Sequence, residues 1–389
     1  MNKLMIATAG SGKTTKLVCE AYNRKPSSVI ILTYTEENEQ EIRNKFHSIY
    51  KCIPSNVVIQ TWFSFLIQHG VKPYQGAMHN DLFSKSVTGL LLVNKKSGIK
   101  FSFNKNGRTI SVPYSEKDEF LKHYFTSNMM IYSDKLSKFI VKCNKATNGE
   151  IADRISRIYK HIFIDEVQDL AGNDFEIVKI LAQTNSEVLL AGDPRQVTYL
   201  THHESKNQKY GTIGIKQYIL DKCKKRGKFL FEIDETTLLK SHRNNESICL
   251  LSSKLYTSQP RSIPCSCSSC RDYAVEHEGI YFVKPNDVKA YLKRYSAIQL
   301  KWDKNISVID SYPSFNFGAS KGKTFNRVII YPTKEMEHWL FNNNVKLSPA
   351  TRAKFYVAIT RARYSVAIIY DYTDRTNIEG IVNYSTPLE

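Results

Sequence analysis

The chain has 389 residues, enough for two or three packed domains, each with its own core. Its 55 Lys and Arg residues against 37 Asp and Glu give a formal charge of +18, which favours a polyanionic partner, nucleic acid first; a basic surface without such a partner is the alternative. Because no apolar run approaches the ~20 residues that cross a bilayer, we exclude an integral membrane protein and expect a cytoplasmic one.

Short apolar, β-branched runs alternate with helix-like segments along the first half of the chain. They lie at residues 4–7, 27–34, 56–61, 161–165 and 187–193. Near-continuous apolar strands of this kind predict a parallel sheet covered by helices on both faces. Ligands of such sheets bind beyond the carboxyl ends of the strands, so the polar clusters that follow these runs should meet in one crevice.

The domain organisation follows from where this pattern stops and resumes. A stretch rich in Lys, Asn, Ser and aromatic residues predicts an inserted subdomain at 70–150, which leaves 1–69 and 151–205 as the first domain. A second alternating series predicts another parallel-sheet domain at 206–389, with a short cysteine-containing insertion near 258–280. The expected fold class is therefore α/β, with two parallel-sheet domains and a small inserted subdomain.

The segment ATAGSGKTT lies between the first strand and a helix, which is the context of a phosphate loop. Gly10 and Gly12 let backbone amides turn inward, Lys13 reaches the β and γ phosphates, and Thr14 can bind magnesium. A Gly-rich turn without a ligand is the alternative. We predict binding and hydrolysis of a nucleoside triphosphate with Mg²⁺. The predicted nucleotide-binding residues are Ala7, Thr8, Ala9, Gly10, Ser11, Gly12, Lys13, Thr14 and Thr15.

Acidic and amide side chains follow two later strands. In HIFIDEVQD, Asp165 is predicted to hold Mg²⁺ and Glu166 to activate the attacking water; a solvated strand end is the alternative. In GDPRQ, Asp193 and Gln196 are expected beside the same crevice, with Gln196 sensing the γ-phosphate. GDP is also a good turn sequence, so this second motif is weak alone.

Read in order, these motifs resemble the UvrD/Rep-like group of superfamily 1 helicases. The first half carries the phosphate loop, LTYTEENEQEIRNKF, QTWFSFL, DEVQD and GDPRQ; the second half carries LLKSHRNNESI, GASKGKTFNRVII and YVAITRARYSVAI. The matching segments run from residue 7 to about residue 371. The resemblance implies two RecA-like motor domains, ATP and Mg²⁺ as cofactors, and movement on DNA in the 3′ to 5′ direction.

The resemblance also assigns residues that the motifs alone do not. Arg243 and Arg361 match the two arginines set against the γ-phosphate, with Arg361 as an arginine finger; two surface arginines are the alternative. The positions that match strand contacts are Thr33, Tyr34, Thr35, Thr61, Trp62, Phe63, Tyr199, Ser320 and Lys321. Trp62 and Phe63 would offer stacking faces to bases, or would instead pack in the core.

The chain also departs from the family pattern. The family's adenine-reading glutamine precedes the loop by more residues than stand before Ala7 here, so adenine is expected only by resemblance. The fifth motif has Lys323 and Thr324 where the family has leucine and glutamate. The interval from Arg243 to Gly318, 75 residues, is too short for the family's large regulatory insertion, which indicates a pared-down motor.

Three of the eight cysteines are clustered in CSCSSC; the other five are scattered singly, as reduced cytoplasmic thiols are. Cys265, Cys267 and Cys270, with His277, could hold a structural zinc ion. The single residue between Cys265 and Cys267 is awkward for the usual zinc knuckle, so a reduced loop without metal is the favoured alternative.

The leading functional hypothesis is an ATP-dependent helicase and translocase on single-stranded DNA. The alternative, from another class, is a nucleic-acid-stimulated ATPase subunit that acts with a partner nuclease in repair or anti-phage defence. An RNA-directed motor is a third hypothesis, because phosphate and stacking contacts read the sugar poorly. No nuclease motif is evident, so any cutting would come from another chain.

Overall fold

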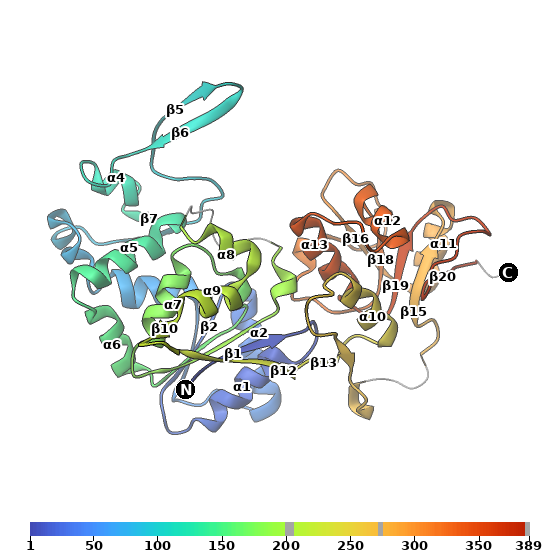
Figure 1. Ribbon diagram of the computed structural model, residues 1–389, viewed down its shortest axis with the longest axis horizontal. Coiled ribbons are helices and arrows are strands. Elements are labelled where there is room, and N and C mark those ends of the chain that lie inside the picture. Colours follow the sequence, from blue (N-terminus) through green and yellow to red (C-terminus); the bar gives the residue numbers. More distant parts are fainter. Residues whose placement is uncertain (199–205, 271–274, 386–389) are drawn as a thin grey trace. The chain divides into compact units, whose positions relative to one another are not determined.

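The computed structural model describes residues 1–198, 206–270 and 275–385 (Figure 1). The chain forms two compact units. The first comprises Met1–Met5, Thr14–Gly192 and Leu200–Asp234, and the second comprises Ile6–Lys13, Asp193–Tyr199 and Glu235–Glu389. No helix in the described ranges is long and apolar enough to cross a bilayer. The domain boundaries inferred from the sequence stay predictions.

A six-stranded sheet has the order β12-β1-β9-β8-β2-β3. Its strands are β1 (Asn2–Ala7), β2 (Val29–Thr33), β3 (Val57–Thr61), β8 (His161–Ile164), β9 (Glu187–Gly192) and β12 (Phe231–Leu238). The pairs β2–β3, β2–β8 and β8–β9 are parallel. Every residue of β2 is buried, as the continuous apolar run VIILT predicts for a central strand.

Helices and short turns connect these strands within the first unit. They are α1 (Lys13–Asn23), α2 (Glu36–Tyr50), α3 (Trp62–Phe65), the π-helical η1 (Leu66–Val71), η2 (Gln75–Ala77), η3 (Asn80–Phe83), α4 (Phe120–Tyr124), α5 (Ser133–Ala146), α6 (Glu150–Ile158), η4 (Val167–Asp169), α7 (Asp174–Ala182), α8 (Gln208–Ile213) and α9 (Ile215–Lys222). Helix α2 shows how local sequence sets its limits. The Thr35 hydroxyl accepts from the Asn38 N–H at 3.2 Å, and Lys51, which follows the last helical residue, has a left-handed φ of 62°.

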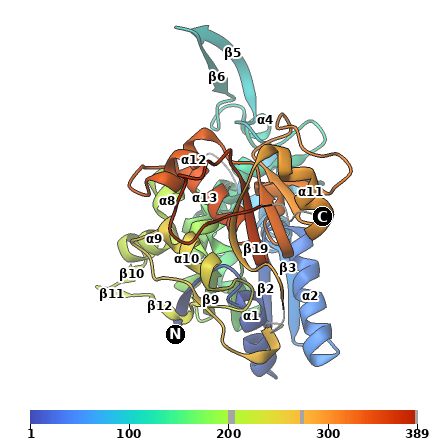
Figure 2. The ribbon, with the colours of Figure 1, turned by 90° about the vertical axis from the view of Figure 1, so that its right-hand side faces the viewer.

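The region after η3 carries small two-stranded elements. β4 (Gly89–Leu91) pairs in parallel with β7 (Met130–Tyr132), and β5 (Ile99–Lys105) forms an antiparallel hairpin with β6 (Arg108–Pro113). This hairpin extends away from the rest of the first unit in both ribbon views (Figures 1 and 2), and Phe101 and Phe103 on it are exposed. A further short hairpin joins β10 (Lys224–Lys225) to β11 (Lys228–Phe229).

The second unit contains a six-stranded sheet of order β17-β16-β18-β19-β15-β20, in which all five pairings are parallel. Its strands are β15 (Gly279–Val283), β16 (Ile298–Lys301), β17 (Ser314–Asn316), β18 (Phe325–Ile330), β19 (Ala362–Ile369) and β20 (Val382–Asn383). Two such parallel-sheet units confirm the predicted α/β fold class.

The helices of the second unit are α10 (Glu246–Lys254), η5 (Pro194–Gln196), η6 (Ser268–Cys270), η7 (Pro285–Asp287), α11 (Val288–Tyr295), η8 (Gly318–Ser320), α12 (Lys334–Phe341) and α13 (Pro349–Ile359). A short parallel pair, β13 (Lys240–Ser241) with β14 (Ile263–Pro264), lies outside the main sheet. The pleat divides the core: Val328 and Ile330 pack in the cluster that contains α10, α12 and α13, whereas Ile329 packs in the cluster of α11.

Candidate nucleotide site

The phosphate loop follows β1 and leads directly into α1, whose first residue is Lys13. Gly10 and Gly12 have φ angles of 72° and 76°, in the left-handed region that favours glycine. A Cβ atom on Gly10 would lie 2.6 Å from the Cβ of Arg243 and 2.8 Å from the Oγ of Ser241. Glycine is therefore required at this position by conformation and by space. The loop delivers the chain to a helix N-terminus, where unpaired N–H groups favour a phosphate.

Oxygen ligands for a cation meet at the start of α1 and the end of β8. The Thr14 hydroxyl donates to Oδ2 of Asp165 at 3.1 Å, and the N–H of Glu166 donates to Oδ1 of the same carboxylate at 2.8 Å. Asp165 is only 4% exposed. A hydroxyl and a carboxylate are the hard oxygen donors that Mg²⁺ prefers, so these two residues fit the predicted metal site.

Glu166 has a left-handed backbone, with φ 53° and ψ 36°, which is uncommon outside glycine and asparagine. Such conformations collect at functional sites, where the surrounding structure compensates for their cost. The half-buried carboxylate of Glu166 accepts a hydrogen bond from the Gln168 side chain. Gly192 makes room for that amide, because a Cβ there would lie 2.4 Å from Gln168 Oε1.

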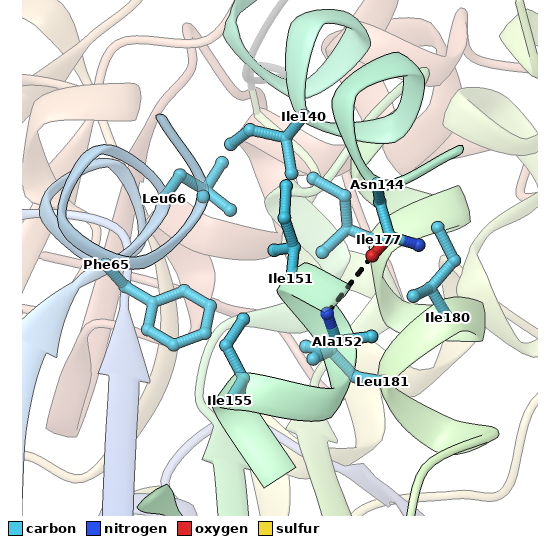
Figure 3. Close-up of a pocket in the computed structure, with 11 residues that line it drawn as sticks. Phe65, Leu66, Ile140, Asn144, Ile151, Ala152, Ile155, Ile177, Ile180 and Leu181 are labelled. Atoms are coloured by element: carbon cyan, nitrogen blue, oxygen red, sulfur yellow. Dashed lines mark hydrogen bonds between the residues drawn. The ribbon is translucent and has the colours of Figure 1, made fainter. Parts of the chain in front are cut away.

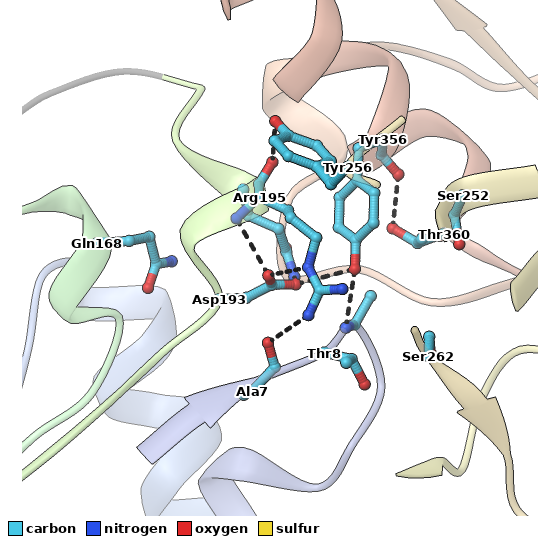
Figure 4. A network of polar contacts seen from close by, with 12 residues as sticks. Ala7, Thr8, Gln168, Asp193, Arg195, Ser252, Tyr256, Ser262, Tyr356 and Thr360 are labelled. Atoms are coloured by element: carbon cyan, nitrogen blue, oxygen red, sulfur yellow. Dashed lines mark hydrogen bonds and ion pairs between the residues drawn. The ribbon is translucent and has the colours of Figure 1, made fainter. Parts of the chain in front are cut away.

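In the second unit, Asp193 and Arg195 of the GDPRQ motif take part in a buried polar network (Figure 4). The Asp193 carboxylate caps η5 by accepting from the Arg195 N–H at 3.1 Å, and it pairs with the Arg195 side chain at 3.0 Å. The same guanidinium donates to the carbonyls of Ala7 at 3.0 Å and Pro260 at 3.1 Å. Burial is the largest single influence and lowers the pKa of Arg195, but the charge and hydrogen bond of Asp193, together with Tyr356 and Tyr256, outweigh it and raise that pKa.

Tyr356 on α13 joins this network to the phosphate loop. Its hydroxyl donates to Oδ2 of Asp193 at 3.1 Å and accepts from the Ala9 N–H at 3.2 Å (Figure 4). Complete burial raises the pKa of Tyr356, so the phenol stays protonated and can make both bonds at once. The phosphate loop is thus hydrogen-bonded to α13, a helix near the C-terminal end of the sequence.

Gln196 lies between Asp193 and Arg361. Its Nε2 donates to Asp193 Oδ2 at 2.7 Å, and its Oε1 accepts from Arg361 Nη2 at 3.2 Å. Arg361 is 1% exposed and also donates to the carbonyls of Val357 and Lys323, at 3.1 and 3.2 Å. A movement of the Gln196 side chain would therefore alter its hydrogen bond with Arg361.

Arg243 is held where the chain leaves β13. Its Nη1 donates to the Thr360 carbonyl at 3.2 Å, while the neighbouring Asn244 side chain donates to the carbonyls of Thr360 and Ala362 at 3.1 and 2.7 Å. In the second unit Arg243 thus lies against Gly10, and Arg361 is hydrogen-bonded to Gln196. In the first unit Thr14, Asp165 and Glu166 lie together.

Two family models match this chain. The model for the viral superfamily 1 RNA helicase core domain matches residues 144–370, and that for the UvrD/REP helicase N-terminal domain matches residues 66–201. The chain belongs to the superfamily 1 helicases. The resemblance inferred from the motifs is thereby confirmed.

Curated relatives of this superfamily 1 chain are partial matches. A probable DNA helicase of Mycoplasma pneumoniae is 26% identical over 236 residues, 49% of this chain and 43% of the relative. The ATP-dependent DNA helicase Rep of Buchnera aphidicola (subsp. Acyrthosiphon pisum) is 23% identical over 235 residues, 50% of this chain and 36% of the relative. The chain spans less than half the length of these relatives.

Two solved structures of arterivirus nonstructural protein 10 (helicase), the second in complex with DNA, are also similar to this chain. They are each 14% identical, with TM-scores of 0.44 and 0.41. The overlap covers 96% of this chain and 60% and 62% of theirs.

The residues assigned to strand contacts in this helicase chain are unevenly placed. Trp62 is 1% exposed and its Nε1 donates to Asp174 at 3.0 Å, and Ser320 is fully buried with its hydroxyl on the Phe317 carbonyl at 2.7 Å. Both side chains are buried, and their assignment as strand contacts stays a prediction. Phe63, 8% exposed, packs edge-on to the ring of Tyr34 with centroids 5.2 Å apart.

The remaining predicted contacts have mixed roles. Thr35 and Thr61 cap α2 and α3, Thr33 is 1% exposed, and Lys321 is partly exposed. Tyr199 lies outside the described residues. Tyr34, Thr35 and Lys321 are thus the predicted contacts with side chains that reach the surface.

His277, the fourth residue of the possible zinc ligand set, does not lie with the three cysteines. His277 stacks on Tyr281 and Tyr295, with ring centroids 3.8 and 3.9 Å apart, and its Nε2 lies 2.8 Å from the Tyr291 hydroxyl. Burial, aided by Arg327 and Arg294, lowers the pKa of His277 to about 4. Its imidazole is thus part of an aromatic cluster, and a different histidine, His242, joins the three cysteines.

Sequence reasoning missed Arg195, Tyr356 and Ser241. The partner of each is a backbone group of the phosphate loop, which no local sequence pattern specifies: the Ala7 carbonyl, the Ala9 N–H and the Ala9 carbonyl, at 3.0, 3.2 and 2.8 Å. Their place within the motifs GDPRQ, YVAITRAR and KSHRN was the available signal.

The first unit also contains an apolar pocket, and no charged side chain of the described residues lines it (Figure 3). It is lined by side chains of η1, α5, α6 and α7, among them Leu66, Ile140 and Ile177. The one polar side chain on its wall, Asn144, uses its Oδ1 to accept from the Ala152 N–H at 3.1 Å. The pocket is therefore a packing feature between helices.

Proposed function

We propose that this chain is an ATP-driven motor that moves along single-stranded DNA and separates strands. The observation that carries the proposal is the 3.1 Å bond between Thr14 and Asp165, with the Glu166 carboxylate on the adjacent residue. A phosphate-loop hydroxyl joined to a strand-end carboxylate, followed by a second acid, supplies the metal ligands and the base that phosphoryl transfer to water needs.

Each residue has a distinct task in this proposal. Lys13 and the loop amides bind the β and γ phosphates, and Thr14 and Asp165 hold Mg²⁺, which neutralises charge on the phosphate oxygens when bound. Glu166 accepts the proton of the attacking water. Arg243 and Arg361 stabilise charge that develops on the γ-phosphate.

Gln196 is proposed as the sensor of hydrolysis. Its amide joins Asp193 to Arg361, so a change in the γ-phosphate that moves Gln196 also alters the hydrogen bonds of Arg361. This linkage would convert the state of the nucleotide into movement of segments that contact nucleic acid.

The substrate is proposed to be DNA, with ATP as the fuel. The charge of +18 suits a polyanion, and the curated relatives named above are DNA helicases, whereas one matching family model describes an RNA helicase core. The 3′ to 5′ direction is likewise proposed from the motif resemblance.

The deciding experiment measures ATP hydrolysis by one preparation alone, with single-stranded DNA, with single-stranded RNA and with duplex DNA. We expect strong stimulation by single-stranded DNA, none in Lys13→Ala, and unwinding of duplexes with a 3′ tail. Greater stimulation by RNA would overturn the choice of substrate, and unwinding of 5′-tailed duplexes alone would overturn the direction. A third outcome is DNA-stimulated hydrolysis without unwinding by the isolated chain. If a partner nuclease then restored unwinding, the ATPase-subunit hypothesis would be favoured.

A further inference from the structure

Four metal-binding side chains meet in the second unit, from two segments of the chain. His242 follows β13, and Cys265, Cys267 and Cys270 follow β14; their ligand atoms all lie within 4.8 Å of one another. Cys265 Sγ is 3.1 Å from Cys267 Sγ, Cys267 Sγ is 2.9 Å from Cys270 Sγ, and His242 Nδ1 is 3.2 Å from Cys270 Sγ. We propose that these four residues bind one structural zinc ion.

The distances suit a tetrahedral site. With Zn–S bonds of about 2.3 Å, two sulfur ligands of one ion lie about 3.8 Å apart. The separations here, from 2.9 Å up to the limit of 4.8 Å, bracket that value, so small side-chain rotations would admit the ion. Three thiolates with one imidazole is a ligand set of known structural zinc sites.

The backbone around the cysteines is already shaped as a metal-binding turn. Cys267 and Cys270 have the two-residue spacing of a zinc knuckle, and the Cys270 N–H donates to the Cys267 carbonyl at 3.2 Å across η6. The Cys267 N–H points at Cys265 Sγ at 3.5 Å. Amide donors of this kind stabilise the thiolate form that a metal requires.

Strand pairing explains why the fourth ligand comes from so far away. β13 and β14 run in parallel with Lys240 opposite Ile263 and Ser241 opposite Pro264. The pairing continues one step further, because the Cys265 N–H donates to the Ser241 carbonyl at 2.8 Å. The next residues along the two strands, His242 and Cys265, are therefore neighbours. The short spacing between Cys265 and Cys267 is no obstacle, since Cys265 belongs to the strand and Cys267 to the turn.

The zinc ion would stabilise the segment that packs on the phosphate loop. The His242 N–H donates to the Gly10 carbonyl at 2.8 Å, and a Cβ on Gly12 would lie 3.7 Å from His242 Cδ2. Ser241 and Arg243, on either side of His242, approach Gly10 most closely. This consequence rests on the proposed function; the metal content does not.

The test is the zinc content of the full chain, purified under reducing conditions without chelator and measured by elemental analysis. We expect about one zinc per chain in the wild type, and loss of most of it in His242→Ala and Cys267→Ser. His277→Gln should keep its zinc, as should Cys52→Ser, a matched change at an exposed cysteine. Wild-type zinc far below one per chain overturns the proposal, as does retention in His242→Ala with loss in His277→Gln.

A second measurement covers the case in which the variants fail to fold. Wild-type protein stripped with a chelator and reloaded with Co²⁺ should show the visible absorption of a tetrahedral thiolate complex, and zinc should restore the thermal midpoint that stripping lowers. A disulfide among the cysteines, seen as missing thiols with no metal, would contradict the site. If the protein binds zinc but does not hydrolyse ATP, the metal site is supported and the proposed function is rejected. If it hydrolyses ATP but binds no zinc, the proposed function is supported and the metal site is rejected.

Discussion

Glu166 combines a left-handed backbone with the position expected of the base that activates water. The conformation turns its carboxylate away from the direction that an extended continuation of β8 would give, and the Asp165 carboxylate holds its N–H at 2.8 Å. The proposed function gives the two acids separate tasks, metal binding for Asp165 and proton transfer for Glu166. The division is testable because removal of one task should leave nucleotide binding intact.

For Glu166→Gln we expect ATP turnover to fall by about 10²- to 10⁴-fold, the usual contribution of a positioned base, with nucleotide affinity retained. Turnover and binding of a fluorescent ATP analogue are measured on the same sample. Glu337→Gln, which alters an ion pair on the surface of α12, serves as the matched control and should change neither. Normal turnover in Glu166→Gln would mean that another group is the base.

We expect the buried Asp193–Arg195 ion pair to contribute to stability. Both side chains are 1% exposed, so removing the guanidinium leaves a buried carboxylate without its counter-charge. For Arg195→Met we expect a loss of about 3–5 kcal/mol in the free energy of unfolding, measured by urea titration. Arg195→Met combined with Asp193→Asn should recover part of it. Equal losses in the single and double variants would contradict a role for the charge.

At the scale of elements, the apolar runs identified the central strands well. Residues 27–34, 56–61, 161–165 and 187–193 contain β2, β3, β8 and β9. The edge strand β12 was missed because FEIDETTL alternates polar and apolar residues instead of forming a continuous run. Only tertiary pairing with β1 makes it part of the sheet.

Short strands were not predicted from the sequence, for a different reason. β13 and β14 have two residues each, too few for any periodic signal, yet their pairing selects His242 over His277 as the neighbour of the cysteines. The role of Trp62 was equally open, because its partner Asp174 is 112 residues away. Local patterns thus predicted which motifs exist, and long-range contacts decided what several of their residues do.

The π-helical element η1 contains a histidine that should make the first unit sensitive to acid. His69 is 3% exposed, lies 3.4 Å from the Tyr159 hydroxyl through Nε2, and is close to Arg154. Burial, with a contribution from Arg154, lowers the pKa of His69 from 6.5 to about 4. Between these values the unfolded chain binds a proton that the folded chain does not, so stability falls as pH falls.

We therefore expect the free energy of unfolding to decrease from about pH 6.5 down to about pH 4, by at most about 1.4 kcal/mol per pH unit from this residue. Urea unfolding across that range measures the slope. His69→Gln should flatten it, whereas His47→Gln, a change near the end of α2, should leave it unchanged. A slope that is the same in all three proteins would assign the acid sensitivity to other groups, such as His123, whose pKa is also lowered by burial.

For the whole molecule, the excess of positive charge makes a prediction about salt. If nucleic acid is bound through its phosphates, counterion release should weaken binding by about 10³-fold or more between 50 and 200 mM salt. Fluorescence anisotropy with a labelled single strand measures this, and circular dichroism at both salt concentrations controls for loss of structure. Affinity that hardly changes with salt would show that the charge serves another purpose.

The bond between the Ala9 N–H and the Tyr356 hydroxyl joins residues 347 positions apart. During synthesis the phosphate loop emerges early, but its supporting partner emerges only after most of the chain has been made. Contacts between residues so far apart in sequence form late and slowly, because the entropy cost of closing a long loop comes before the stabilisation that the contact provides. The phosphate loop of the nascent chain would therefore lack its Tyr356 contact until almost the whole chain has been made, so we expect the loop to reach its final structure only late in synthesis.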